Sequence, residues 1–151
     1  MHLSLGRWQL ACDRDATVAC YAALPVGIDC TCAECRNFTA AHAHAFPAEF
    51  QAIANQLGVD LTKPAELAPF SRDPSGLYVM GGWYHFVGAI RSGADAWGEK
   101  GRGNFEPLVK GLKFGFTSQL LLVAAPFQRH EVAQLEFETR VPWVLAEPEA
   151  E

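Results

Sequence analysis

The sequence has no long hydrophobic run and no excess of basic residues, and both absences restrict what the protein can be. The longest apolar stretch, 120–127, is eight residues long and contains a proline, whereas a helix needs about 20 apolar residues to span a bilayer. The N-terminus lacks the basic segment and apolar core of a secretory signal. The net charge of −5 argues against nucleic-acid binding, which needs a basic surface. These absences predict a cytoplasmic protein without a membrane or nucleic-acid partner.

Sequence motifs of conventional enzymes are also missing. No GxSxG, HExxH or paired-carboxylate motif is present, so no hydrolase or transferase is recognised. The glycine-rich stretch 98–104 matches neither the Walker spacing nor the dinucleotide fingerprint, and we interpret it as a flexible connection. The five cysteines are an odd number, and three of them are crowded into one turn. This pattern suits a reducing compartment better than a disulfide framework.

The size and composition are those of one folded domain. The chain has 151 residues, of which 50% are apolar and 19% are charged, so it can bury a substantial core. We expect a single domain over residues 1–146. Residues 147–151 form an acidic tail that has little reason to be ordered.

The most distinctive stretch places Cys30, Cys32 and Cys35 within six residues. Thr31 and Glu34 have the spacing of a capping box, in which each side chain binds the backbone amide of the other. The pattern therefore predicts Thr31 as the N-cap and Cys32 as the first helical residue. Cys35 would follow one turn later on the same face, and Cys30 would directly precede the cap. The three sulfurs should converge where the free amides of a helix N-terminus favour a thiolate.

Convergent thiols allow three interpretations. The leading one is a zinc site with Cys30, Cys32 and Cys35 as ligands. The alternative is a thiol redox protein in which Cys32 attacks and Cys35 resolves the mixed disulfide. The third is that the thiols pack as small apolar groups. The fourth zinc ligand stays open between Asp29, Cys12, Cys20, His42, His44, His85 and a water, although His42 lies two helical turns, about 10.5 Å, from Cys35.

The segments on either side of the cluster predict a hairpin followed by two helices. Residues 8–12 and 18–24 alternate between apolar and other residues, as two strands joined by a loop at 13–15 would. Their buried thiols, Cys12 and Cys20, would lie about 13 Å apart, beyond the reach of a disulfide. After the cluster, helices are expected over 32–45 and 47–57.

The rest of the chain has mainly strand character. Residues 62–67 are expected to form a short helical turn, and strands are expected over 77–91, 112–117, 120–125 and 134–141. The last of these alternates between apolar and polar residues, which predicts a half-exposed strand. The expected fold is α+β: an antiparallel sheet of about six or seven strands with a helical hairpin inserted after the first two.

A second candidate site lies within the strand at 77–91. Gly81 and Gly82 mark either a bulge or a place where another group approaches the backbone closely. Trp83, Tyr84 and His85 follow, and together they offer two aromatic faces, a hydroxyl, an indole donor and an imidazole. We predict that these three residues bind a small molecule or a protein partner, with core packing as the competing interpretation.

Four segments carry a resemblance to a known family. The runs CTCAECRNF, KPAE, GGWYHFVG and LEFETRVPWVL resemble those of an uncharacterised family of small bacterial proteins, over most of the chain. This resemblance implies one intact domain and implies no catalytic residue, cofactor or partner. From the residues themselves, the expected function is that of a small binding or accessory domain with a zinc-binding CxCxxC cluster.

Overall fold

The structure is a computed structural model that describes residues 1–25, 30–98, 101, 103–109 and 111–147, without the side chains of residues 43 and 44. The strands are β1 (His2–Leu5), β2 (Trp8–Cys12), β3 (Glu66–Arg72), β4 (Tyr78–Ser92), β5 (Glu106–Val109), β6 (Leu112–Thr117) and β7 (Val132–Val141). The helices are α1 (Arg14–Ala22), α2 (Ala33–Ala40), α3 (His42–Ala45) and α4 (Ala48–Leu57), with a 3₁₀ turn at Ala125–Phe127.

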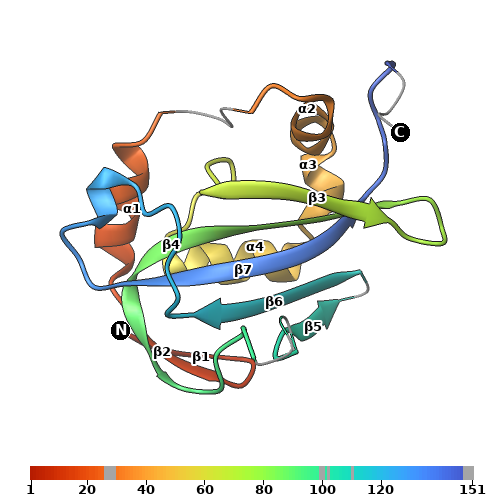
Figure 1. The fold of residues 1–151 in the computed structure, drawn as a ribbon. Helices are drawn as coiled ribbons and strands as arrows, with labels where there is room; N and C mark the ends of the chain where they lie inside the picture. Colours follow the sequence, from red (N-terminus) through yellow and green to blue (C-terminus); the bar gives the residue numbers. More distant parts are fainter. Residues whose placement is uncertain (26–29, 99–100, 102, 110, 148–151) are drawn as a thin grey trace.

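The strands form one antiparallel sheet, which confirms the predicted α+β fold. Across the described residues the sheet has seven strands in the order β1-β2-β4-β7-β6-β5, and β3 pairs with β4 (Figure 1). Among these same residues, no helix combines the length and apolar character needed to cross a membrane.

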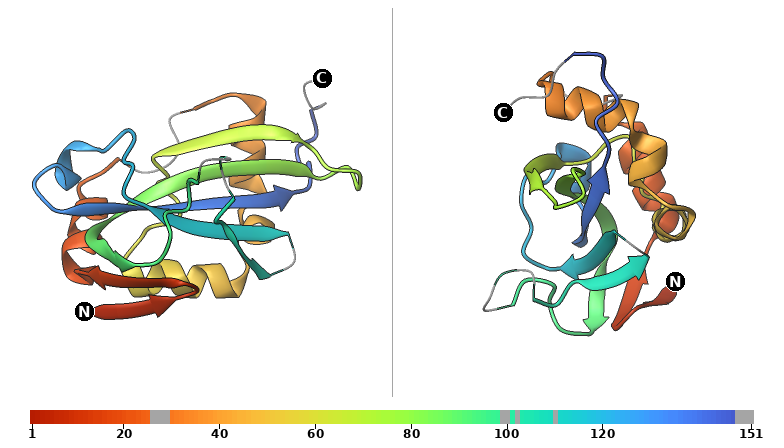
Figure 2. Two further views of the ribbon diagram at one scale, coloured as in Figure 1. Left: turned by 60° about the horizontal axis from the view of Figure 1, so that its bottom comes forward. Right: turned by 90° about the vertical axis from the view of Figure 1, so that its right-hand side faces the viewer.

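Helices α3 and α4 cover one face of the sheet (Figure 2). The ring of Phe46 lies at the centre of this layer, 5.1 Å from the ring of Phe137 and 5.2 Å from that of Phe50. Such close aromatic pairs contribute beyond the apolar area that they bury. The fully buried aromatic residues come from both layers: Trp8, Phe38, Phe46, Phe50, Tyr84, Phe86, Phe114, Phe116, Phe127 and Phe137.

Loops cover the opposite face of the sheet. A Cβ atom added at Gly115 would lie 2.5 Å from the Cβ atom of Ala96, so Ala96 rests directly on β6. Leu121 donates its backbone N–H to Gln134 Oε1 over 3.0 Å. As a result, Gln134 and Glu136 are 0% and 2% exposed. The expectation of a half-exposed last strand is wrong at these two positions, because loops bury its polar face.

The segment after β2 is a helix, so the predicted N-terminal hairpin is wrong. Asp13 is the N-cap of α1, and its carboxylate accepts a hydrogen bond from the backbone N–H of Ala16 at 3.0 Å. This is the usual way to satisfy a free amide in the first turn. Strand β2 pairs with β1 and β4 instead. The buried residues of α1 recur at helical spacing: Thr17, Cys20 and Tyr21.

Two later segments also differ from the prediction. The short helical turn expected over 62–67 is replaced at its end by β3, which begins at Glu66 and forms a hairpin with β4. The strand expected over 120–125 is irregular, and its three leucines are 38%, 58% and 63% exposed. Strand β6 already has β5 and β7 on its two edges, so this segment has no edge of β6 to join. It crosses the loop-covered face instead.

The predicted close approach at Gly82 is confirmed, whereas the bulge is not formed. A Cβ atom at Gly82 would lie 2.3 Å from the carbonyl oxygen of Glu66, so only glycine allows β3 to lie so close to β4. The pairing of β4 with β7 continues without a register shift through Gly81 and Gly82.

One edge of β4 is shared by two strands and a helix. Residues 78–83 pair with β3 and residues 88–92 pair with β2. Between them, side chains of α1 satisfy the backbone of β4. The hydroxyl of Tyr21 donates to His85 O over 2.7 Å and accepts from His85 N over 3.2 Å. The hydroxyl of Thr17 accepts from Val87 N over 2.9 Å. Buried backbone groups need such partners, and these bonds hold α1 against the sheet edge.

The variant Tyr21→Phe tests this role of α1. We expect it to lower the free energy of unfolding by about 1–3 kcal/mol, because the buried N–H and C=O of His85 both lose their partner. Tyr84→Phe is the matched control, since the hydroxyl of Tyr84 makes a single hydrogen bond, to Leu61 O at 2.8 Å, and its loss should cost less. Chemical denaturation measures both. A Tyr21→Phe protein as stable as the parent would contradict the assignment.

Candidate metal centre

The thiols of Cys30, Cys32 and Cys35 lie together at the start of α2, which confirms the predicted convergence. The three sulfur atoms all lie within 4.8 Å of one another, and those of Cys30 and Cys32 are 3.0 Å apart. In a tetrahedral site with Zn–S bonds of about 2.3 Å, two sulfurs are about 3.8 Å apart. The observed sulfur–sulfur distances, from 3.0 Å to at most 4.8 Å, lie on either side of this value. Small side-chain movements would therefore bring the three sulfurs to the spacing that one ion needs.

The cap of α2 lies one residue later than the sequence pattern predicts. Cys32 is the N-cap, and its sulfur accepts a hydrogen bond from the backbone N–H of Cys35 at 3.5 Å. The carbonyl oxygen of Thr31, the predicted cap, accepts from Arg36 Nε over 3.0 Å. The sulfur of Cys32 therefore faces the free amides of the first turn, where negative charge is favoured.

Burial distinguishes the three thiols. Cys30 and Cys32 are exposed, whereas Cys35 is buried. Hydrogen bonding with the thiols of Cys32 and Cys35 stabilises the thiolate form of Cys30 and lowers its pKa. Burial raises the pKa of Cys35. A bound cation would deprotonate Cys35 as well, because metal coordination favours the thiolate.

The C-terminal segment positions α2 over the sheet. Asn37 is 2% exposed, donates from Nδ2 to Pro142 O over 3.0 Å and accepts at Oδ1 from Val144 N over 2.7 Å. Arg36 adds an ion pair with Glu147, the first residue of the predicted acidic tail, whose residues 148–151 lie outside the described part of the chain. The side chain of Asn37 thus serves as the hydrogen-bond partner of the backbone just after β7. The position of Asn37 within a short helix does not indicate this role.

The first predicted helix is divided into two. Helix α2 ends at Ala40, and α3 follows over His42–Ala45 after a break at Ala41. In α3 the ring of His42 lies 5.1 Å from that of Phe46 and 6.4 Å from that of Phe38. Its buried Nε2 atom has no hydrogen-bond partner within the described part of the chain. His42 is thus packed among aromatic rings rather than joined to the three thiols.

No fourth donor joins the three thiols among the described residues. Cys12 and Cys20 are 5% and 4% exposed in the core, and burial raises the pKa of both. The thiol of Cys20 donates to Pro126 O over 3.4 Å. Two further candidates from the sequence, Asp29 and the side chain of His44, lie outside the described residues. Within the described part of the chain, the arrangement is therefore a group of three thiols that could hold a metal ion.

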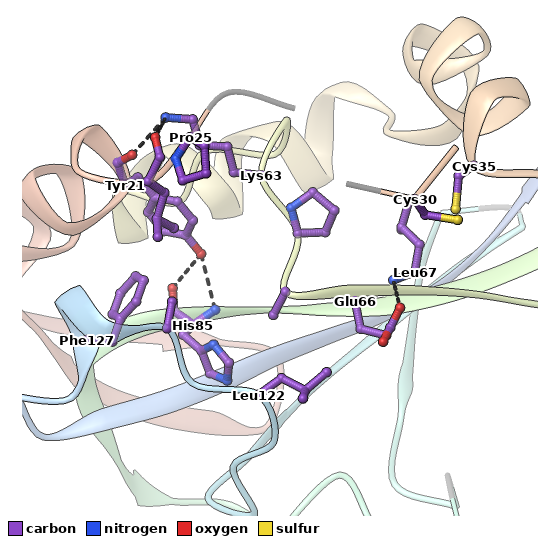
Figure 3. Close-up of a pocket in the computed structure, with 14 residues that line it drawn as sticks. Tyr21, Pro25, Cys30, Cys35, Lys63, Glu66, Leu67, His85, Leu122 and Phe127 are labelled. Carbon is purple, nitrogen blue, oxygen red and sulfur yellow. Dashed lines mark hydrogen bonds between the residues drawn. The ribbon is translucent and has the colours of Figure 1, made fainter. Parts of the chain in front are cut away.

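A cavity of about 340 Å³ begins at the thiols. Figure 3 shows Cys30 and Cys35 at one end and Tyr21, His85 and Phe127 at the other. The volume is in the range of small-molecule sites. The wall between these ends combines polar groups with five apolar residues: Leu24, Pro64, Leu67, Leu122 and Ala124.

Two charged residues of the wall were not recognised in the sequence. Lys63 donates from Nζ to the carbonyl oxygens of Tyr21 and Leu24, over 2.8 and 3.0 Å. It therefore caps the C-terminus of α1, where a cation is favoured. Glu66 is exposed and lies on the side of the cavity nearer the thiols (Figure 3). Both belong to the KPAE segment, and the two charges within these four residues are the only local sign of a binding site there.

The three residues predicted to bind a ligand have different surroundings. Trp83 is half-buried, and its Nε1 donates to Leu121 O over 2.9 Å. Tyr84 is fully buried in the helix-covered core. His85 is buried and lines the cavity. The structure thus brings His85 to the same cavity as the thiols, and ligand binding by the three residues stays a prediction.

A buried hydrogen-bond chain orients the imidazole of His85. Its Nε2 lies 3.0 Å from Gln134 Oε1, which also accepts from the backbone N–H of Leu121. Since this oxygen is an acceptor, Nε2 of His85 carries the hydrogen. Gln134 Nε2 then donates to Glu136 Oε2 over 3.2 Å. Burial lowers the pKa of His85, which favours a neutral ring at the end of the cavity.

Comparison with known protein families, with curated proteins and with solved structures finds no match for this chain. The resemblance noted in the sequence stays a prediction. The candidate site is therefore interpreted from its own chemistry.

Thiol alkylation tests the burial differences. In folded, metal-free protein we expect iodoacetamide to modify Cys30 and Cys32 first, because they are exposed, and to reach Cys12, Cys20 and Cys35 much later, because these are buried and have raised pKa values. Mass spectrometry of peptides over time identifies the modified residues. Uniform modification of all five in folded protein would contradict the burial pattern.

Proposed function

We propose that this protein binds one zinc ion through the thiolates of Cys30, Cys32 and Cys35. The observation that carries the proposal is the convergence of three sulfurs within 4.8 Å. Zinc is borderline-soft and is the common partner of clustered cysteine thiolates. The cytoplasm supplies the reducing conditions in which the thiols remain available.

The arrangement supports a binding role for the zinc rather than a purely structural one. Structural zinc sites are closed by four protein ligands, whereas functional sites keep one position for a water or another ligand. The described residues supply three ligands, and the cavity begins beside two of them, Cys30 and Cys35. The proposed protein is therefore a small binding domain whose metal faces a ligand cavity.

Elemental analysis of purified protein should find about one zinc per chain. Cys30→Ser, Cys32→Ser and Cys35→Ser should each reduce the zinc content and the melting temperature, because metal-binding free energy is coupled to folding. Cys20→Ser is the matched control, since Cys20 lies outside the cluster. Zinc far below one per chain, together with rapid titration of Cys30 and Cys32 in protein as purified, would contradict the proposal.

A second candidate function, thiol redox exchange, is supported by the 3.0 Å contact between Cys30 and Cys32. In this mechanism the Cys30 thiolate attacks a substrate disulfide, releases one thiolate and forms a mixed disulfide. Cys32 then attacks the sulfur of Cys30 and releases the second thiolate. The substrate gains two electrons, and the chain gains one disulfide. This pair differs from the expected Cys32 and Cys35, of which Cys35 is buried.

Oxidised glutathione tests the redox candidate. Metal-free protein should form a disulfide between Cys30 and Cys32 that a reductant reverses, and Cys32→Ser should stop at the mixed disulfide on Cys30. Cys35→Ser should still form the disulfide and serves as the control. Peptide mapping by mass spectrometry distinguishes the species. Failure of the parent protein to form this disulfide would argue against redox exchange.

A further inference from the structure

The cavity beside the thiols indicates which kind of molecule completes the site. Building on the proposed metal site, we infer that the cavity binds a small apolar thiol whose sulfur is the fourth ligand of the metal. Cys30, Cys32 and Cys35 would hold the metal, and the ligand would bind as a thiolate after giving its proton to solvent, so that four thiolates in all would be available to the ion.

The first support is the donor set. Three thiolates converge, and the described residues offer no fourth protein donor within the same 4.8 Å group. An ion already held by thiolates suits a further soft ligand, and a complete set of four thiolates is a common coordination of zinc. An external thiol would supply the fourth sulfur of that set.

The second support is the position and lining of the cavity. It starts at Cys30 and Cys35 and continues to the buried residue Phe127. A ligand held by its sulfur at the thiol end can therefore lay its body along the apolar wall (Figure 3). In small-molecule sites, apolar side chains hold the ligand body and a few polar groups fix its orientation.

The third support is the charge of the lining, which favours an uncharged ligand body. Lys63 already donates to two carbonyl oxygens of α1, and His85 donates from Nε2 to Gln134. Glu66 adds a carboxylate on the side nearer the thiols. The described lining residues therefore offer no cluster of cations of the kind that a phosphate or a polycarboxylate needs.

Cobalt(II) substituted for zinc reports directly on the fourth ligand. Cobalt-loaded protein is titrated with phenylmethanethiol and followed by its sulfur-to-cobalt charge-transfer and d–d absorption bands. We expect a saturable change and an affinity at least tenfold higher than for 2-mercaptoethanol, which has the sulfur without the apolar body. Benzyl alcohol, which has the body without the sulfur, should leave the bands unchanged.

A pair of surface variants tests whether the ligand body lies in the cavity. Leu122 lines the cavity and is 63% exposed, whereas Leu120 lies in the same segment, is 38% exposed and is not part of the lining. Leu122→Asp adds a charge to the wall and should weaken phenylmethanethiol binding about tenfold without changing cobalt binding. Leu120→Asp should weaken neither. Because both positions are exposed, neither change removes core packing.

The outcomes separate this inference from the zinc proposal. Absence of any sulfur-to-cobalt band would refute the metal site itself. Cobalt bands that do not respond to millimolar phenylmethanethiol would refute the thiol ligand and leave the metal site standing. Equal affinity for the two thiols, or no effect of Leu122→Asp, would place the ligand body outside the cavity. A spectral change in Glu66→Gln before any thiol is added would show that Glu66 already holds the fourth position.

Discussion

The shared edge of β4 is the constraint on which the rest of the structure depends. Strands β3 and β2 pair with its two ends, and a buried backbone group left without a partner between them would cost about 1–3 kcal/mol. Tyr21 and Thr17 supply the missing partners, so α1 must lie at this edge. Neighbouring strands are about 4.8 Å apart, whereas a helix with its side chains is about 10–12 Å across. A helix at a strand edge therefore leaves space beside it, and the cavity lies there, between α1 and the start of β3.

The thiols lie at this cavity because the segment after β7, near the C-terminal end of the chain, fixes the position of α2. Local spacing brings the three sulfurs together, but it does not determine where the cluster lies. Asn37 joins α2 to the segment after β7 through two hydrogen bonds, and Phe38 lies beside Phe137 with 6.2 Å between ring centroids. The metal site proposed above is thus assembled from a local motif and a distant anchor, and a change at either should affect it.

The buried polar side chains of β7 are hydrogen-bonded to His85 in the cavity. Gln134 and Glu136 have the alternation of a solvent-exposed face, yet both are buried, and Leu121 and Trp97 from the covering loops donate hydrogen bonds to them. Buried polar groups need hydrogen-bond partners, and Gln134 finds one in His85 at the end of the cavity. These hydrogen bonds hold the imidazole of His85 in one orientation at the end of the cavity. A buried polar network whose groups all have partners specifies a single side-chain arrangement.

The sequence by itself determined the features that depend on near neighbours. These are the convergence of the three thiols, the long strand β4, the close approach at Gly82, and α4 with its left-handed cap at Gly58. Tertiary structure decided the rest. Residues 16–22 have mostly small or apolar side chains that suit a strand or a helix, and the open edge of β4 together with the Asp13 cap favours the helix. Segment 66–72 becomes a strand because β4 offers it an edge, and the polar residues of β7 are buried because loops from elsewhere cover them. The spacing of apolar residues indicates which residues share one face of a helix or strand. It does not indicate which segment covers that face, because the covering segment is far away in the sequence.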